Sequence, residues 1–385
     1  MPRPARPLNR PLRIAIDAHA MGSNLGGNES YITAVIEGLA DYPQHEYFIY
    51  VTDEPVAERV RALCPAARVR ALHTHHPLVR LGWRLTQACR ADRIDALHVQ
   101  YVAPIVGPPI VAMVHDLSYH HHPEWFTKAE GLRFRLTVPW TARRAARVLT
   151  GSEYCRRDIL STFRLPEEKV SVSYHRIRSI FAERSHAEVA GVLERLGVRQ
   201  PYLLAVGNLQ PRKNIPRLID AWQRLRARHA DFTPQFVIVG RKAWMFDDIL
   251  GSARGGAHAA DIVFTDYLPE SDLAALYSGA SVFVYPSLFE GFGLPPIEAM
   301  ACGAPVIVSN TTSLPEVCGE AALYVDPTNV EQLAARIFEL HGDPDRQRAC
   351  REKGLRQAQR FRHSNLIEVT VRAYEEAARP QPSTG

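Results

Sequence analysis

The residues best suited to chemistry lie in the segment Tyr285–Gly303, which reads YPSLFEGFGLPPIEAMACG. An apolar run precedes it, and its two adjacent prolines suit the first turn of a helix, where a backbone N–H has no intrahelical partner. Gly291 and Gly293 leave the loop backbone free to approach a ligand closely. The free N–H groups of a helix behind such a loop bind phosphate. A plain strand–loop–helix connection is the alternative, because a single glycine motif is a weak signal.

Two carboxylates belong to the same segment. Glu290 precedes the predicted helix, and we expect Glu298 in its first turn. A carboxylate at either place accepts hydrogen bonds from hydroxyl groups, such as those of a sugar or a ribose. The alternative for Glu298 is an ordinary acidic residue that interacts favourably with the helix dipole.

Short apolar runs alternate with helical stretches along the chain, which is typical of an α/β fold with parallel sheets. In the first half, strands are predicted at 13–17, 47–51, 96–99, 110–114 and 148–150, and helices at 29–39, 78–90 and 128–146. In the second half, strands are predicted at 202–206, 236–239, 262–264, 282–285 and 306–308. Two successive doubly wound units are the simplest account of this pattern.

The 385 residues suffice for two domains. The stretch 170–200 contains no strong strand and is expected to join them, and Ser364 is a plausible N-cap of the last helix. We predict a first domain over 1–178, a second domain over 179–363, a C-terminal helix over 364–378 that packs back on the first domain, and a disordered tail over 379–385.

The composition is that of a globular protein, with 46% hydrophobic and 23% charged residues. No apolar run approaches the roughly 18–20 residues that a membrane span needs, and Met1–Pro11 does not resemble a secretory signal. Residues 1–178 carry 24 Lys and Arg against 17 Asp and Glu, whereas residues 179–385 carry 22 against 24. The basic half suggests an anionic partner, such as a lipid surface, a nucleic acid or a phosphorylated substrate.

Three patterns could indicate a metal site, and each has a simpler explanation. The six cysteines are scattered without a C-x-x-C pair, which is typical of buried cysteines in a reducing compartment. Asp343 and Asp345 form a D-x-D, but Pro344 between them suits the first position of a helix that Asp343 caps. Adjacent histidines on a strand point to opposite faces, although a loop escapes this objection; the two histidine groups are His73, His75 and His76, and His120, His121 and His122.

The two glutamates, separated by seven residues within EGFGLPPIEAMA, resemble the signature of retaining GT-B glycosyltransferases of glycosyltransferase family 4. Further motifs follow the order of that family, namely Gly26-Gly27, His115-Asp116, Gly151–Asp158, Gly207–Asn214, Val308–Glu316 and Ala322–Pro327. The resemblance therefore covers nearly the whole chain. It implies the GT-B architecture, in which two Rossmann-like domains with parallel sheets face each other across a cleft that holds a nucleotide-sugar donor.

The resemblance assigns roles to four charged residues of the second domain. Arg212 and Lys213 match the basic pair that holds the donor diphosphate and neutralises the leaving group. Without the resemblance, this pair would be interpreted as part of an exposed loop. Glu298 matches the glutamate that binds the ribose hydroxyls, and Glu290 matches the one that faces the donor sugar.

Backbone groups complete the donor site that the resemblance implies. Gly26 and Gly27 match the N-terminal loop that approaches the phosphates, Gly207 opens the first motif of the second domain, and Gly240 follows a strand where nucleotide contacts are expected. In the glycine loop around Gly291, contacts to phosphate or sugar are expected from the N–H groups of Phe292, Gly293 and Leu294.

His115 matches a histidine near the reacting sugar, where an imidazole can hydrogen-bond a hydroxyl or the transition state. Without the resemblance, a single histidine at a strand end would be interpreted as structural. Asp116 is expected to fix the loop or to orient His115, and not to act as a base.

The implied mechanism is retaining transfer without a metal or another cofactor. The departing phosphate would draw the proton from the incoming hydroxyl on the same face, so no protein nucleophile is required. The style of the motifs resembles bacterial mannosyltransferases of polysaccharide assembly. This implies GDP-mannose as the donor and a carbohydrate acceptor, most simply a polyprenyl-linked oligosaccharide.

Several alternatives stay open. The same fold could use UDP-glucose or another donor, could act as a sugar-nucleotide epimerase, or could be a catalytically silent sugar- or nucleotide-binding scaffold. The intact charged residues argue against the scaffold. A NAD-dependent dehydrogenase is not expected, because no G-x-G-x-x-G follows either opening strand.

A predicted helix of the first domain carries Arg133, Arg135, Arg143 and Arg144, and Arg147 follows closely. These residues form either a solvated face or a surface that attracts anionic lipid beside the acceptor. No known reader motif accompanies the charge, so nucleic-acid binding is not expected. The expected location is the cytoplasm, with peripheral contact at the inner face of the cell membrane.

Arg176 departs from the family pattern, because a glycine is expected at this position before the linker. Glycine adopts a positive φ without strain, whereas arginine does so at a cost. We therefore expect the interdomain hinge to be shaped differently from that of relatives.

Overall fold

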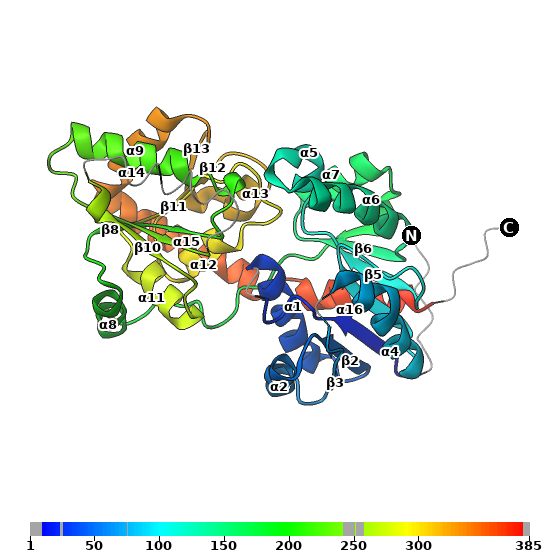
Figure 1. Ribbon diagram of the computed structural model, residues 1–385. Helices are drawn as coiled ribbons and strands as arrows, with labels where there is room; N and C mark the ends of the chain where they lie inside the picture. Colours follow the sequence, from blue (N-terminus) through cyan, green and yellow to red (C-terminus); the bar gives the residue numbers. More distant parts are fainter. Residues whose placement is uncertain (1–9, 24–25, 75, 242–250, 252–257, 380–385) are drawn as a thin grey trace. The chain divides into compact units, whose positions relative to one another are not determined.

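The computed structural model describes residues 10–23, 26–74, 76–241, 251 and 258–379. The chain forms two compact units, one of residues 1–174 and 365–385 and the other of residues 175–364. Each unit is a parallel sheet with helices packed on both of its faces (Figure 1). Within the described residues, no helix has both the length and the apolar content to cross a bilayer.

The first unit contains a seven-stranded sheet in the order β3-β2-β1-β4-β5-β6-β7. Its strands are β1 (Arg13–Asp17), β2 (Glu46–Val51), β3 (Arg68–Ala71), β4 (Ala96–Gln100), β5 (Ile110–Met113), β6 (Arg147–Thr150) and β7 (Val170–Val172). Ile14 and Ile16 point into one buried cluster and Ala15 into the other, as the two-residue period of a strand requires. Both faces are therefore covered, which explains the nearly continuous apolar runs of the central strands.

The helices of the first unit form two layers. One layer consists of α1 (Gly27–Gly38), α2 (Glu54–Leu63) and α16 (Leu366–Ala377). The other consists of α4 (Leu85–Ala91), α5 (Ser118–His121), α6 (Lys128–Arg144) and α7 (Glu153–Phe163). The short helix α3 (Pro77–Val79) and a π-helical turn, Arg80–Arg84, lead into α4. The 3₁₀ turns are Leu39–Asp41, Pro123–Trp125 and Glu167–Lys169.

The second unit contains a six-stranded sheet in the order β10-β9-β8-β11-β12-β13. Its strands are β8 (Tyr202–Val206), β9 (Gln235–Val239), β10 (Ile262–Thr265), β11 (Val282–Tyr285), β12 (Val306–Ser309) and β13 (Ala322–Val325). Its helices are α8 (His186–Leu196), α9 (Ile215–Arg228), α11 (Glu270–Gly279), α12 (Leu294–Ala301), α13 (Leu314–Cys318), α14 (Val330–His341) and α15 (Pro344–Arg362). Its 3₁₀ turns are Pro211–Lys213, Ala259–Asp261 and Gly319–Ala321.

In each sheet, the first three strands are added toward one edge and the later strands toward the other edge. The switch lies between β1 and β4 in the first unit and between β8 and β11 in the second. In open parallel sheets, ligands bind beyond the carboxyl ends of the strands at this switch. The loops after β1, β8 and β11 contain five of the residues that the sequence analysis singled out, namely Gly26, Gly207, Glu290, Gly291 and Gly293.

The join between the units is shorter than the predicted stretch 170–200, because that stretch contains β7 and α8. The backbone N–H of Tyr174 donates to the Asn365 side chain within the first unit, at 3.0 Å. The backbone N–H of Ile177 donates to the carbonyl of Phe361 within the second, at 3.1 Å. The division therefore falls after Tyr174, four residues before the predicted domain end at Arg178.

Three local expectations can be compared with the structure. Asp343 caps α15 by accepting a hydrogen bond from the N–H of Arg346 at 2.9 Å, with a proline in the first turn, so the predicted cap is confirmed. The prediction that Ser364 caps the last helix is wrong, because α16 begins at Leu366 after Asn365. Arg176 is exposed and does not have a positive φ, so a glycine is not required there. Residues 380–385 of the predicted tail lie outside the described residues.

Candidate active site

The glycine loop of the second unit connects β11 to α12, as predicted. Gly293 is the N-cap residue of α12 and has φ of 94°, a conformation that favours glycine. A Cβ at this position would lie 2.6 Å from Cδ2 of Leu314, so the loop has no room for a side chain there. The Ser313 hydroxyl donates to the carbonyls of Glu290 and Phe292, at 2.9 and 3.1 Å, and fixes the loop from α13.

Glu290 is buried in this loop and accepts four hydrogen bonds from side chains. The Lys213 ammonium donates to Oε1 at 2.6 Å and the Arg212 guanidinium to Oε2 at 2.9 Å. The hydroxyls of Tyr285 and Ser287 donate to Oε1 at 2.9 and 2.5 Å. Burial alone would raise the pKa of Glu290, but the two cations and these hydrogen bonds lower it to about 2. Glu290 is therefore ionised at neutral pH.

The two cations come from the 3₁₀ turn Pro211–Lys213, which follows β8. Lys213 is buried, and its ammonium also donates to the Tyr285 hydroxyl and lies 4.8 Å from the centroid of that ring. Its aliphatic chain packs on Gly207, where a Cβ would lie 3.2 Å from Cε of Lys213. Lys213 is therefore held inside the site and is not part of an exposed loop.

Gly240 brings the end of β9 against the loop that follows β8. Its φ is 153°, and a Cβ there would lie 2.0 Å from the carbonyl oxygen of Gly207. Only glycine permits this approach of the two backbones. Lys242, the residue that ends the Gly-Arg-Lys sequence at this position, lies outside the described residues.

Glu298 differs from Glu290 in its surroundings. It is the fifth residue of α12, so the expectation that it occupies the first turn is wrong. The alternative interpretation, an acidic residue that interacts with the helix dipole from the first turn, is excluded for the same reason. It is buried, and the Tyr277 hydroxyl donates to Oε2 at 3.3 Å. Burial and the negative charge of Glu270 raise the pKa of Glu298 to about 8, although the hydrogen bond from Tyr277 and the charge of Arg178 oppose this effect. The carboxyl group is therefore largely protonated at pH 7.

His115 lies in the first unit, two residues beyond the end of β5. It is buried, and its Nε2 is 2.7 Å from Oε1 of Gln100, which ends β4. The ring contacts Tyr31 edge-on, with the centroids 5.0 Å apart. The carboxylate of Asp116 accepts hydrogen bonds from the N–H and hydroxyl of Ser118, at 2.9 and 2.6 Å, and thereby fixes the following turn.

Gly26 and Gly27 form the start of α1. Gly26 is the N-cap residue with φ of 70°, and Gly27 is the first helical residue. The N–H groups of Glu29 and Ser30 both donate to the carbonyl of Gly26, at 2.9 and 3.1 Å. These two hydrogen bonds close the first turn of α1. Asn24 and Leu25, which precede this turn, lie outside the described residues.

Sequence reasoning missed several residues that hold these groups in place. Tyr285 and Ser287 lie inside the motif but had no assigned role, and Tyr277 comes from α11. In the first unit, the buried carboxylate of Asp17 pairs with Arg80 of the π-helical turn, and the charges of Arg80 and His19 lower its pKa despite burial. No sequence signal relates partners 63 positions apart.

Among the described residues, no group of three or more His, Cys, Asp or Glu side chains could hold a metal ion. His121 pairs with Asp158 and His122 with Glu124, at 2.8 and 3.1 Å. His75 lies outside the described residues. The six cysteines are buried, and none of them forms a disulfide.

Comparisons with known proteins agree with the two-unit structure. Residues 25–178 match the family Glycosyltransferase Family 4, and residues 194–357 match the family Glycosyl transferases group 1. O-antigen chain mannosyltransferase B of Escherichia coli is 35% identical over 69% of this chain and 70% of its own length. Serotype-specific mannosyltransferase WbdA of the same species is 28% identical over 73% of this chain, which spans only 35% of the length of WbdA.

Solved structures also resemble the fold of this chain. HepE of Anabaena, in complex with UDP and glucose, superposes with a TM-score of 0.73 and 17% identity, over 94% of this chain and 99% of HepE. The two parallel-sheet units are therefore those of a GT-B fold.

Proposed function

Since the chain belongs to glycosyltransferase family 4 and is an enzyme that takes a nucleotide-sugar donor and a carbohydrate acceptor, we propose that it transfers mannose from GDP-mannose. O-antigen chain mannosyltransferase B, which is 35% identical, supports mannose as the sugar. We further propose that the acceptor is a polyprenyl-linked oligosaccharide of cell-surface polysaccharide synthesis.

The observation that carries the proposal is the cluster of the half-buried Arg212 with the buried Lys213 and Glu290. Two cations and one carboxylate leave one net positive charge, and a buried charge of this kind favours a diphosphate more strongly than an exposed one does. As the bond between sugar and diphosphate breaks, Arg212 and Lys213 stabilise the negative charge that develops on the leaving oxygen. A pKa of about 2 prevents Glu290 from donating a proton, so its role is to accept hydrogen bonds and to position the two cations.

We propose that transfer retains the configuration of the sugar. The bond from the anomeric carbon to the diphosphate oxygen breaks, and a bond to the acceptor oxygen forms on the same face. The acceptor proton passes to the departing diphosphate. Glu290 accepts hydrogen bonds from four side chains in the described structure, which supports a scheme in which this carboxylate does not attack the sugar.

The remaining residues bind and orient the donor in this proposal. Glu298 accepts hydrogen bonds from the ribose hydroxyls, and the N–H groups of Phe292, Gly293 and Leu294 contact the phosphates or the sugar. His115 and the Gly26-Gly27 turn contact the reacting sugar and the phosphates. Arg212 and Lys213 supply the positive charge that a divalent ion would otherwise supply, so the proposal includes catalysis without a metal.

Nucleotide binding and transfer test this proposal together. A thermal-shift screen of GDP, UDP, dTDP and ADP should show the largest stabilisation with GDP. Incubation of GDP-mannose with a polyprenyl-linked acceptor in EDTA should give a mannosylated product with retained configuration. Preferential stabilisation by UDP would favour UDP-glucose as the donor, and loss of turnover in EDTA would refute metal independence. A lack of response to all four nucleotides would favour a silent scaffold.

A further inference from the structure

Large hydrophobic side chains that are exposed to solvent concentrate on three segments of the first unit. Trp83 is 62% exposed and Leu136 is 65% exposed, values that are unusual for side chains of this size. Across the described part of the chain, Tyr267 is the one such residue elsewhere; the others are Leu78, Val79, Trp83, Ile105, Val106, Leu132, Leu136 and Trp140. A gathering of this kind marks an interaction site, whereas single exposed residues do not.

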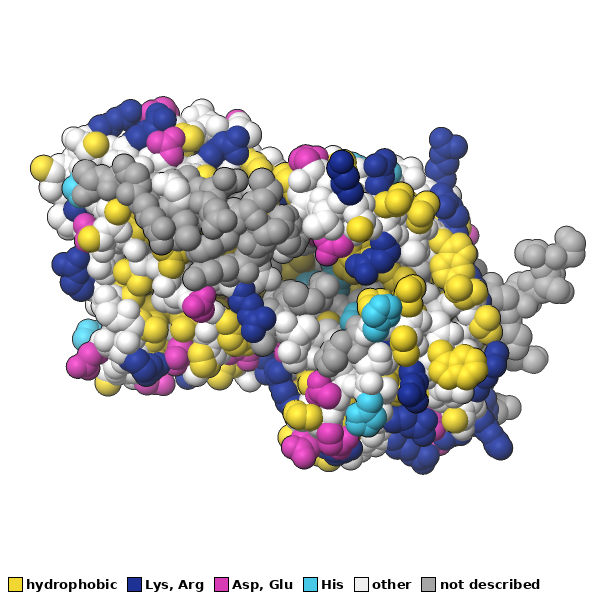
Figure 2. Space-filling model, viewed as in Figure 1, with side chains coloured by type: hydrophobic (Ala, Val, Ile, Leu, Met, Phe, Trp, Pro, Cys, Tyr) yellow, Lys and Arg dark blue, Asp and Glu magenta, His cyan; other side chains and the backbone are white. Residues whose placement is uncertain are grey.

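The three segments are joined to one another by hydrogen bonds. The Thr86 hydroxyl at the start of α4 donates to the carbonyl of Val106 at 2.8 Å. The Arg144 guanidinium at the end of α6 donates to the carbonyl of Ile105. We call the combined face of residues 77–91, loop 103–109 and α6 the α4–α6 surface. Figure 2 shows hydrophobic side chains gathered over α4 and α6 with Lys and Arg side chains among them.

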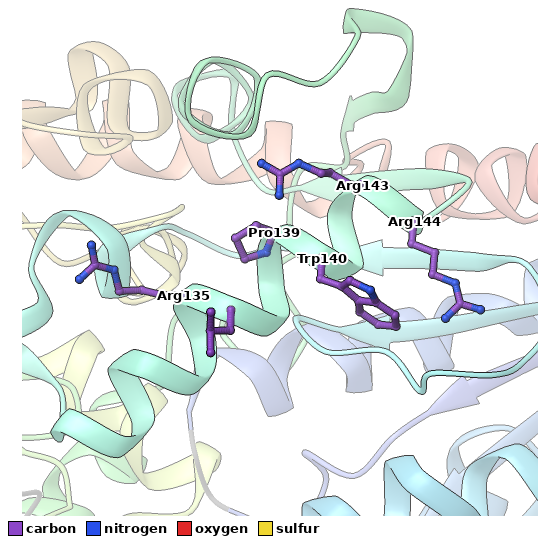
Figure 3. A pocket seen from close by; sticks show the side chains of 6 residues that line it. Arg135, Pro139, Trp140, Arg143 and Arg144 are labelled. Atoms are coloured by element: carbon purple, nitrogen blue, oxygen red, sulfur yellow. The ribbon is translucent and has the colours of Figure 1, made fainter.

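Helix α6 presents an apolar stripe away from the core. Leu132, Leu136 and Trp140 are spaced by four residues and therefore follow one side of the helix. Val138 and Ala142 on the opposite side are fully buried. Figure 3 shows the side chains that line an open groove along the exposed side, namely Arg135, Leu136, Pro139, Trp140, Arg143 and Arg144. The described residues of the first unit leave the three side chains of this stripe exposed.

Positive charge surrounds this apolar stripe. Helix α6 contains five Lys or Arg residues against a single acid, Glu130, and neither residues 77–91 nor loop 103–109 contains Asp or Glu. The guanidinium of Arg144 lies 5.1 Å from the centroid of the Trp140 ring. Exposed tryptophan and leucine with adjacent arginine is the composition of surfaces that lie at a membrane–water interface.

We propose that the α4–α6 surface binds the face of an anionic phospholipid bilayer. Trp83, Trp140 and the aliphatic side chains enter the headgroup region, and the arginines pair with lipid phosphates. A nucleic acid would use the cations but would leave the aliphatic side chains in water. A second copy related by a two-fold axis would bring the arginines of both copies together. This proposal depends on the first unit alone and not on the donor or the acceptor.

Co-sedimentation of the full chain with vesicles tests the proposal. The protein should bind vesicles of phosphatidylcholine containing about one third phosphatidylglycerol, bind weakly to phosphatidylcholine alone, and dissociate as salt rises. The double variant Arg135→Glu, Arg143→Glu should lower the partition coefficient by roughly tenfold or more, because each cation near an anionic surface contributes about fivefold. Leu136→Ser with Trp140→Ser should lower it as well, since the apolar side chains contribute separately.

The matched control is Arg348→Glu with Arg356→Glu on the exposed face of α15, which changes the net charge equally. It should bind anionic vesicles like the original protein, and an equal loss would show that only net charge matters and would overturn the proposal. All variants should keep the melting temperature of the original protein without added nucleotide, which reports folding. A lack of binding to anionic vesicles would overturn the proposal. The same holds if the α4–α6 surface mediates self-association or nucleic-acid binding and not vesicle binding. Because no donor is present, either result leaves the donor proposal untouched.

Discussion

Glu298 should make nucleotide binding tighten as the pH rises through neutrality. Its pKa is about 8 in the structure, because the carboxyl group is buried and is affected by the negative charge of Glu270. Ribose hydroxyls that donate to a carboxylate stabilise its ionised form and lower its pKa. Nucleotide binding therefore releases a proton from Glu298, and protonation at lower pH competes with binding.

The size of the effect follows from this pKa. If the bound state requires the ionised carboxylate, the dissociation constant of the nucleotide should be about 25-fold larger at about pH 6.5 than at about pH 8.5, or about 2 kcal/mol. The groups that face Glu298 are the Tyr277 hydroxyl, which donates to it, and the Arg178–Glu270 ion pair. Arg178 remains charged over this range, so Glu298 itself is the group that titrates.

Isothermal titration calorimetry with GDP across this pH range measures the dependence, and buffers of different ionisation enthalpy measure the released proton. Glu298→Gln is the control, because glutamine cannot titrate but can still accept from a hydroxyl. The variant should show only the pH dependence of the nucleotide itself. The same pH profile in the original protein and in Glu298→Gln would refute the reasoning and the assignment of Glu298 to the ribose.

Three further expectations concern the same site. Lys213→Ala should lower the transfer rate by about 100- to 1,000-fold while the protein stays folded; near-normal turnover contradicts the assigned role. The Glu290 pKa of about 2 should contribute about 3 kcal/mol of folding stability above about pH 4.5 that disappears toward pH 2, so Glu290→Gln should flatten the acid limb of chemical denaturation. Gly240→Ala should cost about 3 kcal/mol or more because its Cβ would meet the carbonyl of Gly207. Gly27→Ala, whose Cβ has no described atom within 4 Å, should leave the melting temperature unchanged.

The central strands could be predicted from the sequence, and three edge strands could not. Buried on both faces, β1, β4 and β8 appear as apolar runs. The strands β3, β7 and β13 each end a sheet, and all three were missed. In β3, exposed arginines alternate with half-buried residues, a composition that edge strands use to discourage further pairing. Their strand conformation depends on a neighbour that the local sequence does not specify.

In the candidate site, too, the motifs could be predicted from the local sequence, but the contacts between distant residues could not. The glycine loop, Glu290 and the cations of the 3₁₀ turn could be located from motifs, but their contact could not, because Lys213 and Glu290 lie 77 positions apart. The raised pKa of Glu298 depends on Tyr277 and Glu270 of α11, which the sequence analysis had no reason to associate with it. Ionisation states therefore became visible only once the elements were packed together.

The opposite ionisation of the two glutamates has a consequence for the order of events in the site. Both are buried in one loop–helix segment, but Glu290 faces two cations and Glu298 faces another carboxylate. At pH 7 these groups comprise two cations, one carboxylate and one largely neutral carboxyl group, and their net positive charge would attract the proposed donor diphosphate. If Glu298 binds the ribose as proposed, its ionisation on binding cancels that excess of positive charge. The site then favours a diphosphate with its ribose attached over a free phosphate of equal charge, because only the nucleotide supplies the hydroxyls that stabilise the second carboxylate.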